Sequence, residues 1–218
     1  MKRISMAAAI WLAAGAATAQ EPPAGPKATP QEIAEARARA DRLIADADAA
    51  GIFVNATDDD GLARATHVAS GMTCSFDGGP EDRVHIFPGT PRGDDVGCVS
   101  RDEALDIDLT LYATRYRPMP SQAAVLAGAQ QAIENRWPDA EAYTAGLPSM
   151  TLEGQPPTSS AAYKIELNGE HKLTLVLVSH RGEWSFKARA TGPYDEPMGV
   201  ALYSGVLFEA ALMDRAKD

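Results

Sequence analysis

The sequence predicts an α+β fold, with a mostly antiparallel sheet of about six or seven strands flanked by helices and tied by one disulfide. Three observations support this prediction. The stretch 163–191 contains consecutive runs with strand periodicity, separated by tight-turn dipeptides. Other segments have apolar residues at helical spacing behind good capping residues. The two cysteines, Cys74 and Cys98, are an even number and can form one intramolecular bond.

The beginning of the chain, residues 1–19, has the layout of a secretory signal peptide. Two basic residues open it, an apolar run follows at 7–17, and a small-x-small cleavage motif ends at Ala19. The apolar run is too short for a transmembrane span, which disfavours the alternative of an uncleaved anchor. We therefore expect cleavage near Ala19 and a periplasmic or secreted protein without stable membrane insertion.

The composition is acidic. There are 30 Asp and Glu residues against 20 Lys and Arg residues, and the formal net charge is −10. Cleavage after Ala19 removes two positive charges and makes the balance more negative still. An acidic protein gains nothing from counterion release on nucleic acid and is repelled by anionic lipid. We therefore expect no nucleic-acid partner.

An oxidising compartment favours a structural disulfide between Cys74 and Cys98. The alternatives are a redox pair and half of a metal site. The separation of the two residues is far longer than the C-x-x-C spacing of redox motifs, so the disulfide is preferred. We expect each cysteine to lie in a strand, one at 68–76 and the other at 96–99, with the two strands side by side.

Residues 20–28 are rich in proline and predict a linker, and residues 29–64 predict a helix followed by an acidic turn. Thr29 is a suitable N-cap, followed by Pro30 at the first helical position and by Glu32 to complete a capping box. Alternate aspartates at 58–60 resemble part of a calcium loop, but the glutamate such a loop needs is missing. A solvated acidic turn is therefore preferred.

Residues 65–218 are predicted to form the α+β domain. After the strand at 68–76, further strands are expected at 83–87, 96–99 and 107–114. A helix then starts after Ser121 and ends before Pro138. Its expected buried stripe consists of Leu126, Ala129, Ile133 and Trp137.

The meander at 163–191 follows, with a first turn at Asn168-Gly169, a dipeptide that readily adopts positive φ. In its last strand Trp184 and Phe186 are expected to be core anchors. A closing helix is predicted from about 197 to 217. Its expected core stripe consists of Tyr203, Val206, Leu207, Ala210 and Met213.

The most suggestive chemical cluster is cationic. Lys187 and Arg189 share one face of the last strand of the meander, Lys164 lies two strands away, and Arg115 ends the strand at 107–114. If these side chains converge, they could hold a carboxylate or phosphate group, with arginine acting as a bidentate fork. The prediction is a possible site for a small anionic ligand.

The alternative is a solvated sheet face on which these cations pair with acids such as Glu166 and Asp108. No stronger motif competes with either interpretation. The histidines have no metal-binding spacing, and the chain contains no Gly-x-Ser-x-Gly and no papain-like cysteine pattern. The sequence therefore predicts no catalytic residue, no metal site and no cofactor, and it favours a protein that is not an enzyme.

The order of elements resembles a known fold group. The matching segments are a Ser-Gly-x-x-x-x-Phe strand ending at Phe76, a Thr-Leu-Tyr-Ala-Thr-Arg strand at 110–115, and the strands at 162–165, 173–178 and 182–189, with a closing helix. Over roughly residues 65–213 the chain resembles the PsbP-like extrinsic photosystem subunits and the DcrB-like envelope proteins, and also exported proteins of proteobacteria. The resemblance implies an antiparallel sheet flanked by helices and a non-enzymatic accessory or assembly role. It transfers no catalytic residues.

These observations together predict a periplasmic, non-catalytic binding or accessory protein, with an envelope protein or a small anionic ligand as its partner. Two alternatives come from other classes. One is a periplasmic hydrolase whose site is assembled from distant residues, which a buried ionisable pair in a cleft would favour. The other is a small-ligand carrier, which would need an apolar cavity between sheet and helix.

Overall fold

A computed structural model gives the fold of the chain and describes residues 27–148 and 156–213. The predicted signal peptide at 1–19 and all but the last two residues of the predicted linker lie outside the described residues. Across the described ranges, none of the helices combines the length and apolarity needed to cross a membrane.

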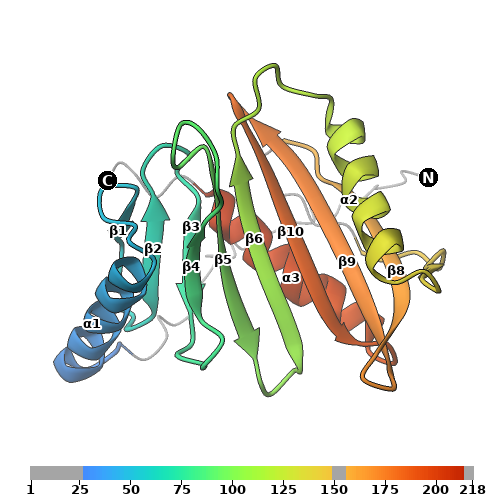
Figure 1. Cartoon of the computed structure of the whole chain (residues 1–218). Coiled ribbons are helices and arrows are strands. Elements are labelled where there is room, and N and C mark those ends of the chain that lie inside the picture. Colours follow the sequence, from blue (N-terminus) through green and yellow to red (C-terminus); the bar gives the residue numbers. More distant parts are fainter. Residues whose placement is uncertain (1–26, 149–155, 214–218) are drawn as a thin grey trace, which may run out of the picture.

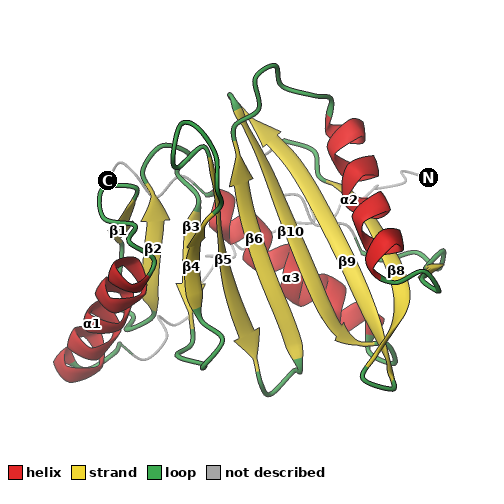
Figure 2. Ribbon diagram, in the orientation of Figure 1, coloured by secondary structure: helices red, strands yellow, loops and turns green. Residues whose placement is uncertain are grey.

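The fold is α+β, as predicted, and its main element is a seven-stranded antiparallel sheet (Figures 1 and 2). In spatial order its strands are β4 (Arg83–Ile86), β5 (Asp95–Asp102), β6 (Ile107–Thr114), β10 (Trp184–Pro193), β9 (Glu170–Arg181), β8 (Ser159–Leu167) and β7 (Glu141–Ala142). The strand count and the antiparallel pairing agree with the sequence prediction.

The predicted meander is confirmed as β8, β9 and β10, which are consecutive antiparallel neighbours. Asn168 and Gly169 join β8 to β9 with φ values of 53° and 82°. Positive φ at both residues is the geometry of a tight two-residue hairpin, which explains why this dipeptide fixes the register. Trp184 and Phe186 are buried, as expected.

A second, three-stranded antiparallel sheet contains β1 (Phe53–Asn55), β2 (Ala63–His67) and β3 (Thr73–Phe76). The single strand predicted at 68–76 is therefore wrong, because the chain reverses between β2 and β3. Gly71 has a φ of 74°, which a side chain rarely allows, and the His67 N–H donates to the Met72 carbonyl. The Ser-Gly dipeptide marks a turn between two strands here and does not lie within one strand.

Three helices flank the sheets: α1 (Pro30–Asp46), α2 (Gln122–Arg136) and α3 (Pro197–Leu212). The N-terminal capping box of α1 is present, with both the Thr29 and Glu32 side chains bonded, as predicted. In Figure 1, α1 and α2 lie in front of the two ends of the strand array, and α3 crosses behind its middle. The helices thus cover only part of the front.

The apolar core lies on both sides of the large sheet, but it is much larger behind it. Leu175, Phe186 and Phe208 belong to the rear core between the sheet, α3 and the small sheet. A smaller front core contains Ile133 of α2 and Val176 of β9. The apolar stripe predicted for this helix is confirmed, because its other members, Leu126, Ala129 and Trp137, pack in the same cluster.

The stripe predicted for the closing helix is correct only in part. Tyr203 and Leu207 pack against the main core, but Val206 is 49% exposed and Met213 is 37% exposed, whereas Val200 and Ser204 are buried. Almost every residue of α3 is apolar or small, so its periodicity cannot show which side faces the sheet. Packing against β10, β9, β6 and β3 decides it instead.

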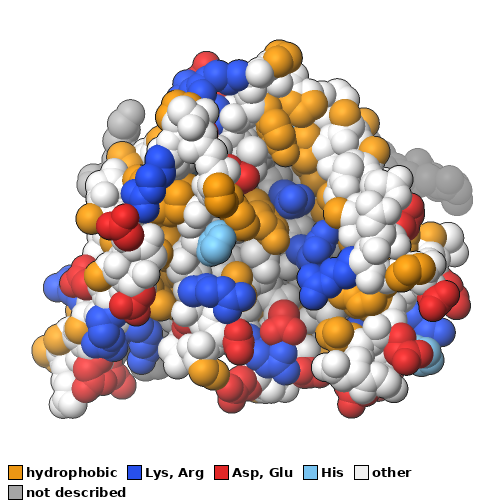
Figure 3. Space-filling model, viewed as in Figure 1, with side chains coloured by type: hydrophobic (Ala, Val, Ile, Leu, Met, Phe, Trp, Pro, Cys, Tyr) orange, Lys and Arg blue, Asp and Glu red, His pale blue; other side chains and the backbone are white. Residues whose placement is uncertain are grey.

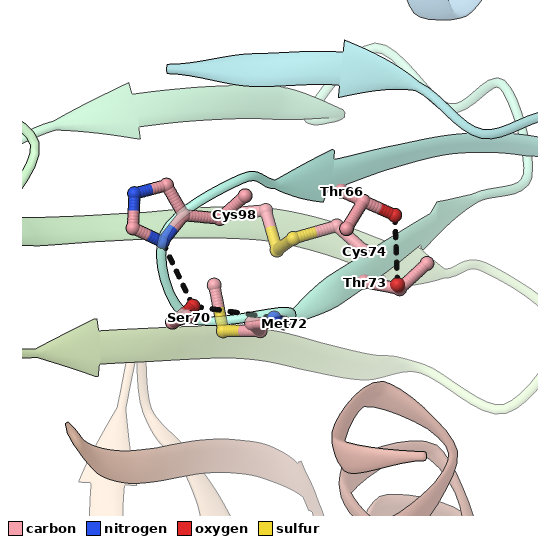
Figure 4. The surroundings of a disulfide bond; sticks show 7 residues. Thr66, Ser70, Met72, Thr73, Cys74 and Cys98 are labelled. Atoms are coloured by element: carbon pink, nitrogen blue, oxygen red, sulfur yellow. Dashed lines mark hydrogen bonds between the residues drawn. A yellow bond between two sulfur atoms is a disulfide. The ribbon is translucent and has the colours of Figure 1, made fainter. Parts of the chain in front are cut away.

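The predicted disulfide joins Cys74 of β3 to Cys98 of β5, with a Cα–Cα distance of 6.3 Å (Figure 4). The sequence predicted two strands side by side. They do lie near each other, but they belong to different sheets and are not neighbours within one sheet. Beside the bond, the Thr66 and Thr73 hydroxyls are 2.8 Å apart and join β2 to β3. The disulfide therefore fastens the small sheet onto the rear face of the large one.

Candidate anion-binding site on the open face of the sheet

The front of the large sheet between α1 and α2 is not covered by a helix, and we call it the open face (Figures 1 and 3). Strand alternation decides which side chains belong to it. Along β10, Phe186, Ala188 and Ala190 join the rear core, so the residues between them face forward. The forward residues of β10 and of its partner β6 are Ser185, Lys187, Arg189 and Thr191, with Asp108, Thr110, Tyr112 and Thr114.

Lys187, Arg189 and Arg136 form a cationic cluster beside α2. Figure 3 shows Lys and Arg side chains gathered there, over the middle strands. Burial lowers the pKa of the Lys187 ammonium, and repulsion from Arg189 lowers it further, while Asp95 opposes the effect. Burial also lowers the pKa of Arg189, and the charge of Arg136 adds to this. Arg189 is therefore repelled by two like charges, Lys187 and Arg136.

None of these three cations forms an ion pair with a carboxylate of residues 27–148 or 156–213. Several other bases of the large sheet are paired with acids. Arg101, for instance, lies 2.5 Å from Asp106 and 2.7 Å from Asp108. Acids outnumber bases by 30 to 20 in this chain, so unpaired cations are not the result of a shortage of acids. Half-buried charges without counter-ions are unfavourable unless something else neutralises them.

Three buried polar atoms on the same face also lack a hydrogen-bond partner within the described part of the protein. They are Arg189 Nε, Ser185 Oγ and His180 Nε2. Ser185 of β10 and His180 of β9 are direct cross-strand partners, next to the pair formed by Phe186 and Ser179. Buried polar atoms in native proteins almost always have partners, and where one does not, a bound ion can be the missing partner.

An aromatic row extends from the cations toward the edge strand. Lys187 Nζ lies 4.4 Å from the centre of the Tyr112 ring, and Tyr112 stacks on Phe87 with 5.7 Å between ring centres. His85 lies edge-on to Phe87 at 4.4 Å. Gly97 lies beneath Phe87, and a Cβ there would come within 3.3 Å of its ring. The glycine thus lets the aromatic ring lie across β5.

The structure brings together two of the four cations named from the sequence. Lys187 and Arg189 lie side by side on the open face, whereas Lys164 lies on the opposite face, level with Leu173 of the rear core. Its Nζ is 5.5 Å from the Tyr194 ring centre. Arg115 ion-pairs with Glu183. The predicted pairing of Asp108 with these cations is also absent, since Asp108 pairs with Arg101.

Arg136 was missed by the sequence reading. It is the last residue of α2, and its guanidinium lies 4.6 Å from the centre of the neighbouring Trp137 ring. Only its sequence position beside the end of the apolar stripe could have drawn attention to it. Its proximity to Arg189 depends on how α2 packs on β9.

His67 and Ser70 bear on the hydrolase alternative, because a histidine hydrogen-bonded to a serine is one arrangement of base and nucleophile. Ser70 Oγ is 2.8 Å from His67 Nδ1, and it also accepts a hydrogen bond from the Met72 N–H at 3.2 Å (Figure 4). The imidazole is 1% exposed, between Phe53 and Trp184, and burial lowers its pKa to about 4. These contacts stabilise the turn between β2 and β3 and leave no open side for a substrate.

The acidic turn at 58–60 is neutralised by arginine. Asp60 makes a bidentate pair with Arg64 at 2.5 and 2.6 Å, and Asp59 pairs with Arg37 at 3.6 Å. Throughout the two described segments, no three His, Cys, Asp or Glu side chains are grouped in a way that could hold a metal ion.

The space between α3 and the sheet bears on the carrier alternative. The cavity there, lined by Phe76, Leu109, Leu111 and Leu207 among others, has about 20 Å³. This volume is enough for roughly one water molecule, whereas ligand pockets measure several hundred Å³. This cavity offers no room for a small-molecule cargo.

Comparisons with known proteins give structural similarity alone. No protein-family model and no curated protein sequence matches the chain. Among solved structures, LpqN of Mycobacterium tuberculosis, described as involved in cell envelope biogenesis, is 15% identical, with 62% of this chain and 85% of that chain covered and a TM-score of 0.36. The solution structure of cyanobacterial PsbP (CyanoP) from Synechocystis sp. PCC 6803 is 14% identical, with 66% and 90% covered and a TM-score of 0.42. The second belongs to the PsbP group that the sequence resembles, but at these TM-scores neither similarity supports a statement about function.

Proposed function

We propose that this protein is an exported, non-catalytic binding protein that holds an anionic group on the open face of its sheet. The observation that carries the proposal is the cluster of Lys187, Arg189 and Arg136, three cations on one face without an acidic partner among the described residues. An anion bound there would neutralise the cluster and accept hydrogen bonds from the N–H groups of its lysine and arginine side chains.

The predicted signal peptide and the Cys74–Cys98 disulfide support a site of action in the periplasm or outside the cell. An accessory role in the envelope, with the anionic group presented by a small ligand, fits the position of the site on the open face. The mechanism is binding by preformed charge, since Lys187 and Arg189 lie on one strand, β10, and Arg136 lies at the end of α2.

Isothermal titration calorimetry with inorganic pyrophosphate tests the proposal. The Lys187→Met and Arg189→Met variants should each bind at least about tenfold more weakly than the wild type, which is about 1.4 kcal/mol. Affinity should also fall with ionic strength, as expected for a charge-driven contact.

Lys164→Met is the matched control. Lys164 and Lys187 are both half-buried lysines over a tyrosine ring, but on opposite faces of the sheet. The control should bind like the wild type. Absence of pyrophosphate binding, or equal losses in the Lys164 and Lys187 variants, would refute the proposal.

A further inference from the structure

We infer that the ligand of the open face is a small organophosphate whose phosphate group is attached to an aromatic ring. This inference rests on the proposed function and adds the chemical class of the ligand. It follows from the composition of the site, which has a cationic part on β10 and α2 and an aromatic part formed by His85 of β4, Phe87 directly after β4, and Tyr112 of β6.

The charge of the cationic part fits a dianion better than a monoanion. The titratable groups that act on Lys187 and Arg189 are each other, Arg136, the phenol of Tyr112 and one carboxylate, Asp95. Three positive charges and one negative charge leave an excess of two. A phosphate monoester carries close to two negative charges above its second pKa of about 6, whereas a carboxylate or a sulfate ester carries one.

The donors of the cluster also suit phosphate. Arg189 has a buried Nε without a partner, and a guanidinium presents several N–H groups in a fork that matches two phosphate oxygens. Lys187 adds a compact charge two positions before Arg189 on the same face. Alternate residues of a strand are about 7 Å apart, so these two long side chains can both reach one phosphate placed between them.

The aromatic part begins where the cationic part ends. Tyr112 contacts Lys187 on one side and stacks on Phe87 on the other, and Phe87 leads to His85. Phe87 is half-buried and His85 is exposed, so the rings are accessible along the open face. A phosphate held by Lys187 would direct its ester substituent over this row, where an aromatic ring can stack.

Phe87 lies across β5 because its ring fills the space above Gly97. This packing role does not explain why His85 and Tyr112 extend the row on either side of Phe87. His85 is on the edge strand, where it is the cross-strand partner of Gly97, and it is exposed beside the Phe87 ring.

The test compares three probes by calorimetry at pH 8: phenyl phosphate, methyl phosphate and phenyl sulfate. Phenyl phosphate should bind about tenfold more tightly than methyl phosphate, because one stacking contact between its ring and an aromatic side chain raises the affinity by about this factor. It should also bind at least about tenfold more tightly than phenyl sulfate, which has the same ring but a single charge.

Phe87→Leu should abolish the advantage of phenyl over methyl phosphate and leave methyl phosphate binding unchanged. The matched control Tyr194→Leu, on the opposite face, should keep the full advantage. Thermal unfolding of both variants checks that the fold is retained. A fall in methyl phosphate binding in Phe87→Leu would overturn the assignment of the ring row.

The outcomes separate this inference from the proposed function. Equal affinity for phenyl and methyl phosphate would overturn the aromatic part, and equal affinity for phenyl sulfate would overturn the preference for a dianion. In both cases anion binding itself would stand. Failure of all three probes and of pyrophosphate to bind would overturn the inference and the proposed function together.

Discussion

The two faces of the seven-stranded sheet differ in how their charges and apolar groups are satisfied. The rear face is closed by α3 and the small sheet, and its side chains form the main core. The open face uses alternate residues of the same strands, yet it carries half-buried cations without acidic partners among the described residues. The comparison indicates that the rear face stabilises the fold, whereas the open face holds its charges at some energetic cost, which is what the proposed anion binding would offset.

The largest expected effect comes from breaking the rear face. Phe186→Ala should lower the free energy of unfolding by about 3–5 kcal/mol, because the side chain is 2% exposed and its loss leaves a cavity. Urea unfolding at pH 7 measures this. Thr110→Ala, a half-buried change on the open face, is the control and should cost under about 0.5 kcal/mol.

The attachment of the small sheet comes next. Replacing Cys74 and Cys98 together by serine should lower the free energy of unfolding by about 3.5 kcal/mol, as the loop length implies in the chain-entropy model. Urea unfolding of the double variant, compared with the wild type with and without reductant, gives the value. Unchanged stability would show that α1 and the core contacts hold the two sheets together unaided.

His67 makes the junction between the two sheets sensitive to pH. Its folded pKa of about 4 is below the ordinary value of 6.5, so the unfolded chain binds its proton more readily. The stability contributed by neutral His67 is therefore complete above pH 6.5 and is lost as the pH falls toward 4. Between pH 7 and pH 4 this should amount to about 3 kcal/mol.

Urea unfolding of the wild type and of His67→Gln at several pH values isolates this contribution from that of the carboxylates. The wild type should lose about 3 kcal/mol more than the variant over this range. Parallel pH dependence in the two proteins would contradict a buried neutral imidazole at this position.

The smallest expected effect is on the open face and has the opposite sign. Lys187→Met should leave the free energy of unfolding unchanged or raise it by up to about 1 kcal/mol, because it removes a desolvated cation that Arg189 repels. Lys172→Met should lower it by up to about 1 kcal/mol, since Lys172 ion-pairs with Asp106 at 2.6 Å and with Glu170 at 2.8 Å. A clear loss of stability in Lys187→Met would mean that the open face is structural after all.

Local patterns were sufficient to predict some parts of the molecule. The meander could be read because its strands alternate and Asn168-Gly169 specifies a tight turn. The same alternation placed Lys187 and Arg189 on one face. The turn at 70–71 was missed because a Ser-Gly pair is compatible with a continuous strand as well as with a reversal, and only the pairing between β2 and β3 distinguishes the two.

The sequence by itself determined the α+β class, the meander, the first two helices and the pairing of the only two cysteines, because these depend on local periodicity, capping and composition. The tertiary structure alone decided which side of α3 is buried and that Cys74 and Cys98 join two different sheets. It also decided that Arg136 lies close enough to act on Arg189, whereas Lys164 and Arg115 lie outside the cationic cluster. The reason is physical: strand alternation fixes a face relative to its own strand, whereas the packing of separate elements fixes which faces meet.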